Sequence, residues 1–297
     1  MKYVLTLIGN NAAPLQPAHL GAAASLLPAK FASEWLAPDM ACDLTADIDP
    51  SKAKFLEKAL RDRLEGEKID IVLQPALHRR KKLLVADMDS TIIQQECIDE
   101  LADELGIKPQ ISEITETAMR GEIEFEPALR ARVALLKGLP ETSLQKVYDE
   151  RIRQTAGAQA MIQTMRAHGA TAALVSGGFT FFTQRVADAV GFQTNQANIL
   201  IIEDGKLTGE VSEPILGRQA KVEALLKLRE EHRLLRAETM AVGDGANDLD
   251  MIAEAGLGIA YHAKPVVAEA AAARIDHGDL TALLYLQGYR IGEFARA

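Results

Sequence analysis

Acidic residues gather in two short segments of the chain, and the first of them has the pattern of a metal site. Asp87 and Asp89 lie in the sequence DMDST, directly after the apolar run Leu83–Ala86. If the backbone stays extended here, side-chain alternation turns both carboxylates to one side, about 7 Å apart. Two such carboxylates repel each other unless a cation offsets their charge. The segment therefore predicts a bound metal; two acidic loop residues followed by a helix cap at Thr91 are the alternative.

The second acidic segment, GDGANDLD, covers residues 243–250 and follows the apolar run Thr239–Val242. It contains Asp244 and Asp248, and its glycines permit a close approach of the backbone. Its acidic density exceeds what helix capping requires. Because Mg²⁺ prefers hard oxygen ligands and normally keeps waters, Asp87 and Asp244 with one backbone carbonyl would form a suitable Mg²⁺ site. No comparable pattern indicates zinc.

A third segment, Ser176-Gly177-Gly178, follows the apolar run Thr171–Val175. A hydroxyl followed by two glycines leaves backbone N–H groups open to an anion, although a tight turn would explain the glycines equally well. Open α/β sheets bind their ligands at the carboxyl ends of the strands. The three segments are therefore expected to meet at one edge of a sheet.

The elements that must position these residues follow an alternating pattern. Apolar runs at 83–86, 171–175 and 239–242 are separated by helical stretches, which predicts an α/β fold with a parallel sheet. The region from Ile92 to Ile152 has few strand signals and is predicted to be a helical insertion. Strands at 199–202 and 206–211 flank Asp204-Gly205, a strong hairpin signal that lies outside the parallel pattern.

The first 75 residues follow the order β-α-β-β-α-β, with strands at 3–8, 34–36, 42–46 and 69–73 and helices at 17–27 and 51–64. This is the ferredoxin-like arrangement, and its topology resembles the ACT-type small-ligand modules. The basic run His78–Lys82 then marks a domain boundary, and we interpret it as a solvated linker rather than a nucleic-acid patch. The predicted domains are residues 1–77, ferredoxin-like and ACT-like, and residues 78–297.

Composition excludes several classes of protein. A chain of 297 residues that is 48% hydrophobic and 25% charged is typical of a globular protein. Its net charge of −9 offers no positive field to nucleic acid or to an anionic membrane. Apolar stretches fall short of the ~18 residues of a membrane span, and residues 3–9 are better explained as a strand than as a secretory signal. Cys42 and Cys97, outside any C-x-x-C pair, predict a reduced, cytoplasmic setting.

From residue 83 to about residue 290, the motifs resemble those of the haloacid dehalogenase superfamily of phosphotransferases. That pattern is D-x-D-x-T, a Ser or Thr that ends the second strand, a Lys that opens a later helix, and G-D-x-x-x-D. The chain contains all four in this order: Asp87, Asp89 and Thr91; Ser176; Lys221; and Gly243 and Asp244 with Asp248. The resemblance implies a Rossmann-like parallel sheet and a helical cap, here at about residues 94–155.

The helical insertion resembles that of the phosphoserine phosphatase family in Glu96, Met119, Phe125 and Arg132. The family assigns the Glu to the substrate ammonium and the Arg to its carboxylate, a role that suits the planar guanidinium fork. Taken singly, Glu96 and Arg132 would be interpreted as solvated helix charges. Met119 and Phe125 would be interpreted as core residues.

The resemblance implies Mg²⁺-dependent hydrolysis of O-phospho-L-serine to L-serine and phosphate, a step of serine biosynthesis. Asp87 would be the nucleophile that forms an aspartyl-phosphate, and Asp89 would be the general acid and then the general base. The resemblance also implies that Asp244 and the Asp89 carbonyl hold the metal together with Asp87. It implies that Lys221, Ser176 and N–H groups around Gly177 offset the charge of the phosphate. Asn247 and Asp248 would orient the phosphate and the water at the metal.

Two alternatives stay open. One is an enzyme of the same architecture that acts on another small phosphomonoester, or that passes the phosphoryl group to an alcohol. The other is a binding protein in which residues 1–77 sense an amino acid and the second domain is inactive. The expected partner is a small-molecule substrate rather than nucleic acid or a membrane, and a homodimer is left open.

Overall fold

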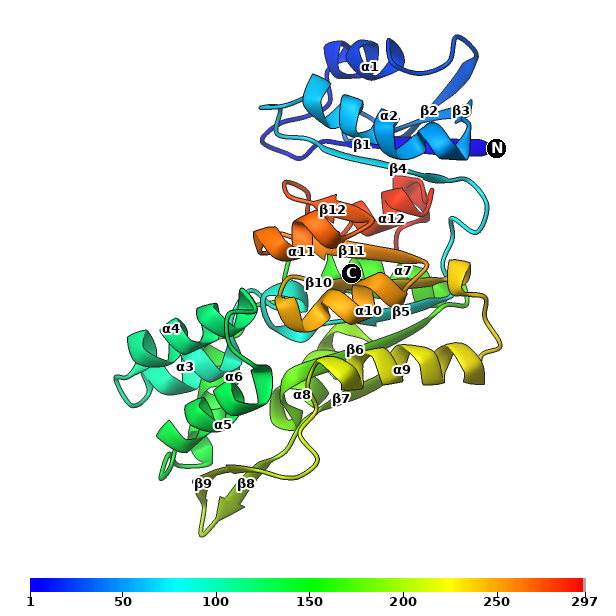
Figure 1. Cartoon of the computed structure of the whole chain (residues 1–297). Coiled ribbons are helices and arrows are strands. Elements are labelled where there is room, and N and C mark those ends of the chain that lie inside the picture. Colours follow the sequence, from blue (N-terminus) through cyan, green and yellow to red (C-terminus); the bar gives the residue numbers. More distant parts are fainter. Residues whose placement is uncertain (296–297) are drawn as a thin grey trace.

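The computed structural model describes residues 1–295, which form three regions (Figure 1). An amino-terminal module, blue and cyan in the figure, lies above a central parallel sheet with its flanking helices. A group of green helices projects from the lower left of the sheet and lies beside a two-stranded hairpin. The α/β fold with a parallel sheet and a helical cap, predicted from the sequence, is confirmed.

The amino-terminal module has the predicted β-α-β-β-α-β order. Its elements are β1 (Lys2–Ile8), α1 (Pro17–Ala24), β2 (Phe31–Ala37), β3 (Ala41–Asp47), α2 (Pro50–Arg63) and β4 (Asp70–Pro75). The sheet order is β2-β3-β1-β4, and β1 runs antiparallel to both of its neighbours. Leu5 lies opposite Leu44 and Leu73, and these leucines pack with helix residues such as Leu60. This apolar layer holds the helices against one face of the sheet.

The other face of that sheet packs against the carboxyl-terminal part of the chain. Ile8 and Val72 share a hydrophobic cluster with residues of α12 (Ala282–Leu286).

The interpretation of residues 78–82 as a solvated linker is wrong for two of its members. Arg79 donates to the Asp43 carboxylate and to the backbone carbonyls of residues 285 and 286, while buried Lys81 donates to the carbonyl of residue 237. Buried polar groups need such partners, and Arg79 connects the amino-terminal module to the carboxyl-terminal part of the chain.

The central sheet has the order β12-β11-β10-β5-β6-β7, and all of its strand pairs are parallel. Its strands are β5 (Leu83–Ala86), β6 (Thr171–Phe179), β7 (Thr194–Asn198), β10 (Thr239–Gly243), β11 (Leu257–Tyr261) and β12 (Ala273–Ile275). Helices α7 (Ala158–Ala167), α8 (Thr180–Val190) and α12 contribute to the cluster on one face, and α9 (Arg218–Glu231) and α10 (Leu249–Glu254) to that on the other. Burial of both faces explains why the central strands β5, β10 and β11 are almost wholly apolar, whereas the edge strand β7 is polar.

The helical insertion forms a cap between β5 and β6. It contains α3 (Cys97–Asp103), α4 (Lys108–Met119), α5 (Phe125–Leu135) and α6 (Thr142–Arg151). The predicted hairpin is also confirmed: β8 (Leu200–Glu203) and β9 (Lys206–Val211) are joined by Asp204 and Gly205, both at positive φ. Backbone hydrogen bonds between Leu207 and residues 138 and 139 attach the hairpin to the cap.

Among residues 1–295, no helix is both long enough and apolar enough to cross a membrane. Cys42 and Cys97 are free and buried. The reduced setting that they suggested stays a prediction.

Candidate active site

The three polar segments meet because their strands are neighbours in the sheet. Strand β5 lies between β10 and β6, and these are the strands that carry Asp87, Asp244 and Ser176 at or near their carboxyl ends. The strand order thus confirms the predicted meeting point. Segments about 90 and 160 residues after Asp87 in the sequence thus contribute to one site, as expected for a parallel sheet.

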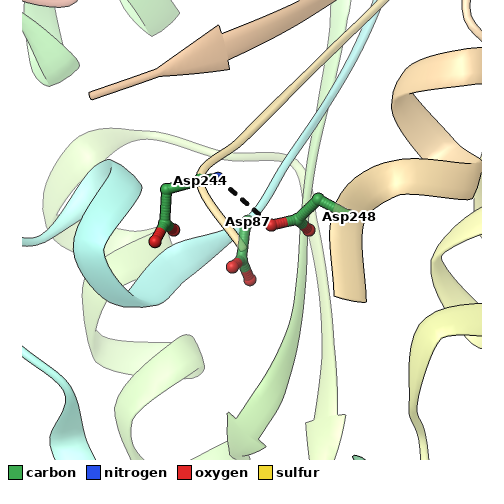
Figure 2. Close-up of side chains that lie close together, drawn as sticks. All are labelled: Asp87, Asp244 and Asp248. Carbon is green, nitrogen blue, oxygen red and sulfur yellow. Dashed lines mark hydrogen bonds between the residues drawn. The ribbon is translucent and has the colours of Figure 1, made fainter. Parts of the chain in front are cut away.

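Asp87, Asp244 and Asp248 form a buried carboxylate cluster (Figure 2). One oxygen from each side chain lies within 4.8 Å of the other two. Asp248 Oδ2 accepts the backbone N–H groups of Asp244 at 3.2 Å and Gly245 at 3.1 Å. A Cβ at Gly243 would overlap the Asp248 carboxylate, so a glycine is required for this close approach.

Lys221 supplies positive charge to the cluster. Its Nζ lies 2.6 Å from an oxygen of Asp87 and 2.6 Å from Asp248 Oδ1. Although burial alone would lower the pKa of Lys221, the carboxylates of Asp248 and Asp87 raise it, so the ammonium stays charged. One lysine does not balance three carboxylates. Burial, with the charge of Asp248, raises the pKa of Asp87 well above its ordinary value and that of Asp244 to about 7.

The donor set fits a hard divalent cation. Both oxygens of Asp248 are already engaged, one by Lys221 and one by backbone N–H groups. One oxygen of Asp87 contacts Lys221, and one oxygen of Asp244 accepts the Thr91 hydroxyl at 3.1 Å. The other oxygen of each carboxylate receives no hydrogen bond from residues 1–295. Oxygen ligands and an excess of negative charge suit a hard divalent cation, and Asp87 and Asp244 are the side chains that have an oxygen left to hold it.

The Asp89 carboxylate lies outside this cluster. Its Oδ1 accepts the backbone N–H of Cys97 at 2.8 Å and its Oδ2 accepts the Ser176 hydroxyl at 3.1 Å. Asp87 and Asp89 are each extended, but between Met88 and Ile92 only Asp89 and Ser90, which has a positive φ of 54°, depart from helical geometry. The continuous extended backbone that would turn both carboxylates to one side is therefore not present. The third member of the side-chain cluster is therefore Asp248 rather than Asp89. Burial raises the pKa of Asp89, which favours a carboxyl group that can donate a proton.

One pocket contains all of the predicted substrate-binding residues except Lys221. Its lining includes Asp87, Asp89, Glu96, Ser176, Gly177 and Asn247, and from the cap helices Met119, Phe125, Leu129 and Arg132. Lys221, Asp244 and Asp248 contact Asp87 or lie beside it but do not line this pocket. Most of the residues predicted from the sequence thus line the pocket, while Lys221, Asp244 and Asp248 lie outside the lining and place charge beside Asp87.

Glu96 and Arg132 are not the solvated helix charges that single-residue reasoning would suggest. Arg132 is 5% exposed, and its Nη1 donates to Thr115 Oγ1 at 3.0 Å. Glu96 Oε1 accepts the Ser90 hydroxyl at 2.6 Å. Burial, followed by the negative charge of Asp89, raises the pKa of Glu96 well above its ordinary value. A cation placed in the pocket beside Glu96 would offset this effect.

Met119 and Phe125 join the cap to the core. The Phe125 ring lies against Gly177 so closely that a Cβ there would overlap it, and the Met119 sulfur lies similarly against Gly245. Gly178 donates its N–H to Ser176 Oγ at 2.8 Å, so only part of the glycine pair stays open to an anion. Asn247 Oδ1 is buried and accepts no hydrogen bond from residues 1–295.

Sequence reasoning missed the residues that orient the predicted ones. Ser90 holds Glu96 and Thr115 contacts Arg132. Asn198 ties Gly177 to the segment before α9, because its Nδ2 donates to the carbonyls of Gly177 at 2.9 Å and Leu216 at 3.1 Å. Of these residues, only Ser90 could have been identified from the sequence, because it lies inside the DMDST motif.

Comparison with known proteins agrees with this geometry. Residues 84–253 match the haloacid dehalogenase-like hydrolase family. A phosphoserine phosphatase of Archaeoglobus fulgidus is 41% identical over 243 residues, covering 81% of this chain and 70% of that protein. A HAD family hydrolase from Salmonella enterica serovar Typhi superposes with a TM-score of 0.84 at 29% identity, covering 96% of this chain and 98% of that one. A substrate-bound phosphoserine phosphatase complex superposes with a TM-score of 0.67 at 41% identity, covering 69% and 98% of the two chains.

Proposed function

The chain belongs to the haloacid dehalogenase-like hydrolase family, and we propose that it is a phosphoserine phosphatase, which hydrolyses O-phospho-L-serine to L-serine and phosphate in serine biosynthesis. The observation that carries the proposal is a single pocket in which Asp87 of the core faces Glu96 and Arg132 of the cap. Phosphoserine has a phosphate, an ammonium and a carboxylate, and each has a counterpart of suitable charge here. The similarity to the Archaeoglobus fulgidus phosphoserine phosphatase supports the same substrate.

In this mechanism one carboxylate oxygen of Asp87 attacks phosphorus, and the bond from phosphorus to the serine oxygen breaks. Asp89 donates its proton to that oxygen, and serine leaves. In the second step Asp89 takes a proton from a water molecule, which attacks the aspartyl-phosphate and releases phosphate with Asp87 restored. General acid–base catalysis of this kind contributes typically ~10²–10⁴-fold in rate. Two displacements through a covalent intermediate replace one more difficult displacement.

Charge on the transferring phosphoryl group is offset by residues fixed in advance. Lys221 contacts Asp87 directly, and Ser176 and Gly177, near the end of β6, line the same pocket as Asp87. Asn247, with its oxygen free of protein partners, and Asp248 would orient phosphate and water. Positioning and electrostatic stabilisation supply most of the catalysis of phosphoryl transfer.

Hydrolases of this family need a divalent metal, and we propose Mg²⁺, held by Asp87, Asp244 and the backbone carbonyl of Asp89. The ion would supply positive charge to the phosphate oxygens. Removal of metal with a chelator should abolish turnover, and Mg²⁺ should restore it. Asp244→Asn should raise the Mg²⁺ concentration needed for half-maximal activity. Full activity in metal-free buffer would contradict the proposal.

A substrate panel tests the function itself. Phosphate release should be fastest with phosphoserine and much slower with phosphoethanolamine, which lacks the carboxylate, and with phosphoglycolate, which lacks the ammonium. A different best substrate would favour another phosphomonoesterase of the same architecture. Transfer of phosphate to an added alcohol, at the expense of release to water, would favour a phosphotransferase.

We also propose that residues 1–77 form a domain separate from the catalytic unit, since every proposed catalytic residue lies beyond residue 78. A chain that begins at residue 78 should keep its kcat but unfold at a lower temperature. The reason is that Arg79 loses Asp43, and three backbone N–H groups of residues 276–278 lose their acceptor Asp70. Loss of all activity in a folded shortened chain would make the first 77 residues part of the catalytic unit.

A further inference from the structure

A buried hydrogen-bonded chain of three side chains connects helices α3, α4 and α5 of the cap. Asp99 of α3, Thr115 of α4 and Arg132 of α5 are 8%, 3% and 5% exposed. Arg132 Nη1 donates to Thr115 Oγ1 at 3.0 Å, and Thr115 Oγ1 lies 2.8 Å from Asp99 Oδ1. The second Asp99 oxygen accepts the hydroxyl of Ser112 at 2.6 Å.

The direction of these hydrogen bonds follows from the number of protons. Thr115 has one hydroxyl proton and two acceptors within reach, Asp99 Oδ1 at 2.8 Å and the Ile111 carbonyl at 3.1 Å. The charged and nearer acceptor is the stronger one. Thr115 therefore donates to Asp99, which leaves a lone pair of its hydroxyl oxygen to accept from Arg132.

This arrangement leaves most of the guanidinium free. Of its five N–H groups, Nε donates to the carbonyl of Ala128 at 3.2 Å and one N–H of Nη1 donates to Thr115. The other three find no acceptor among residues 1–295, and Arg132 lines the substrate pocket. Two parallel N–H groups of a guanidinium match the two oxygens of a carboxylate.

We propose that Thr115 and Asp99 are positioning residues for substrate specificity. They hold the guanidinium fork of Arg132 toward the pocket without occupying the N–H groups that bind substrate. A direct pairing of Asp99 with Arg132 would fill the fork with an internal carboxylate. The intervening hydroxyl keeps the negative charge near enough to stabilise the buried cation but separate from the face that binds substrate. This inference rests on the proposed function, because it assigns Arg132 to the substrate carboxylate.

Two matched changes in α4 test the hydrogen-bonded chain of Asp99, Thr115 and Arg132, which we call the relay. Thr115→Val keeps the shape of the side chain but removes the hydroxyl, and Thr115→Ser restores the hydroxyl on a smaller side chain. Ser112→Ala is the control, because it removes the other hydroxyl that Asp99 accepts while leaving Thr115 in contact with Arg132. Steady-state kcat and KM are measured for phosphoserine and for phosphoethanolamine, which never engages Arg132 through a carboxylate.

We expect Thr115→Val to raise KM for phosphoserine on the order of tenfold, with kcat within about twofold of the unaltered protein. KM for phosphoethanolamine should change less than about twofold, and Thr115→Ser should recover most of the loss. Ser112→Ala should leave both substrates nearly unchanged. If Thr115→Val impairs both substrates equally, or Ser112→Ala matches it, the chain of hydrogen bonds only supports the cap and the proposal is wrong.

The unaltered protein separates this proposal from the proposed function. If it shows no preference for phosphoserine over phosphoethanolamine, the assignment of Arg132 to a substrate carboxylate fails, and the relay fails with it. If it prefers phosphoserine but Thr115→Val keeps that preference in full, the function stands and only the relay is overturned.

Discussion

The two walls of the pocket hold their charged groups in different ways. The core wall contains Asp87, and Asp244 and Asp248 lie beside Asp87 but outside the pocket lining. All three are short side chains at or shortly after the ends of strands, and Asp248 is fixed by backbone N–H groups and by Lys221. On the cap wall, Glu96 and Arg132 are long side chains. The Ser90 hydroxyl orients Glu96, and the Thr115 hydroxyl orients Arg132 together with the Ala128 carbonyl of its own helix.

This difference suits two tasks: the core wall holds the groups proposed to react with phosphate, and the cap wall holds the groups proposed to recognise the rest of the substrate. Backbone geometry changes little when neighbouring side chains change, so the core wall keeps the reacting groups at constant positions, as electrostatic catalysis requires. A long side chain held by one hydroxyl can be replaced without a change in the sheet. Changes in the core wall should therefore affect every phosphate ester, whereas changes in the cap wall should affect only substrates that carry the group they bind.

The largest effect is expected from Asp87→Asn. A carboxamide is a poor nucleophile and cannot form the acyl-phosphate, so turnover of phosphoserine and of phosphoethanolamine should both fall on the order of 10³-fold or more. Phosphoserine should still bind, since Glu96 and Arg132 are intact, and calorimetry of the variant would measure this. Substantial turnover in a sample free of unaltered protein would exclude Asp87 as the nucleophile.

Asp89→Asn should have the next largest effect, and it depends on the leaving group. Loss of the general acid should slow phosphoserine hydrolysis by ~10²–10⁴-fold. An aryl phosphate, whose phenolate leaves without protonation, should still phosphorylate the enzyme, so a burst of phenol release precedes slow turnover. Equal losses of the first chemical step for both substrates would remove the main support for Asp89 as the acid.

Arg132→Ala should give an intermediate and selective effect. Removal of the charge-assisted partner of a bound carboxylate costs about 1.5–3 kcal/mol, which is about tenfold or more in kcat/KM for phosphoserine. Phosphoethanolamine, without a carboxylate, serves as the internal control and should lose little. A uniform loss for both substrates would place Arg132 among the residues that support the cap, and the two walls would no longer differ in role.

The core wall was predictable from the sequence because its geometry is local. Asp87 and Asp244 follow apolar runs that are buried on both faces of the sheet, and the rule for parallel strands places their ends together. These statements need only the strand pattern, not the packing of distant segments.

Contacts between distant segments were not predictable in the same way. Arg79 accompanies His78 and Lys82 in a run typical of a solvated linker, yet it contacts Asp43, 36 residues away in sequence, and the carbonyl of Leu286, 207 residues away. Asp89 and Asp248 are both acidic residues of a motif, and only the folded chain shows that Asp248 joins the cluster while Asp89 pairs with Ser176. Thr115 has no motif at all and gains its role from helix packing.

The smallest effect is expected where the two walls touch each other rather than the substrate. Lys264, which follows β11 in the core, donates through Nζ to both carboxylate oxygens of Glu116 on α4 of the cap, at 3.0 and 2.7 Å. The side chains are 30% and 52% exposed, and exposed ion pairs contribute about 0.2–1 kcal/mol. The backbone N–H of Lys264 donates separately to the Asp244 carbonyl, so a side-chain change leaves the core wall intact.

Lys264→Met should therefore lower kcat/KM by no more than about fivefold, and by the same factor for phosphoserine and phosphoethanolamine. Glu116→Gln should have a similar effect, and the double variant should lose little more than either single one, because both remove the same pair. The loss should shrink at high ionic strength, where the pair is already screened in the unaltered protein. A loss confined to phosphoserine would instead assign Lys264 or Glu116 to recognition, and the contact between the walls would then be part of the specificity that we ascribe to the cap alone.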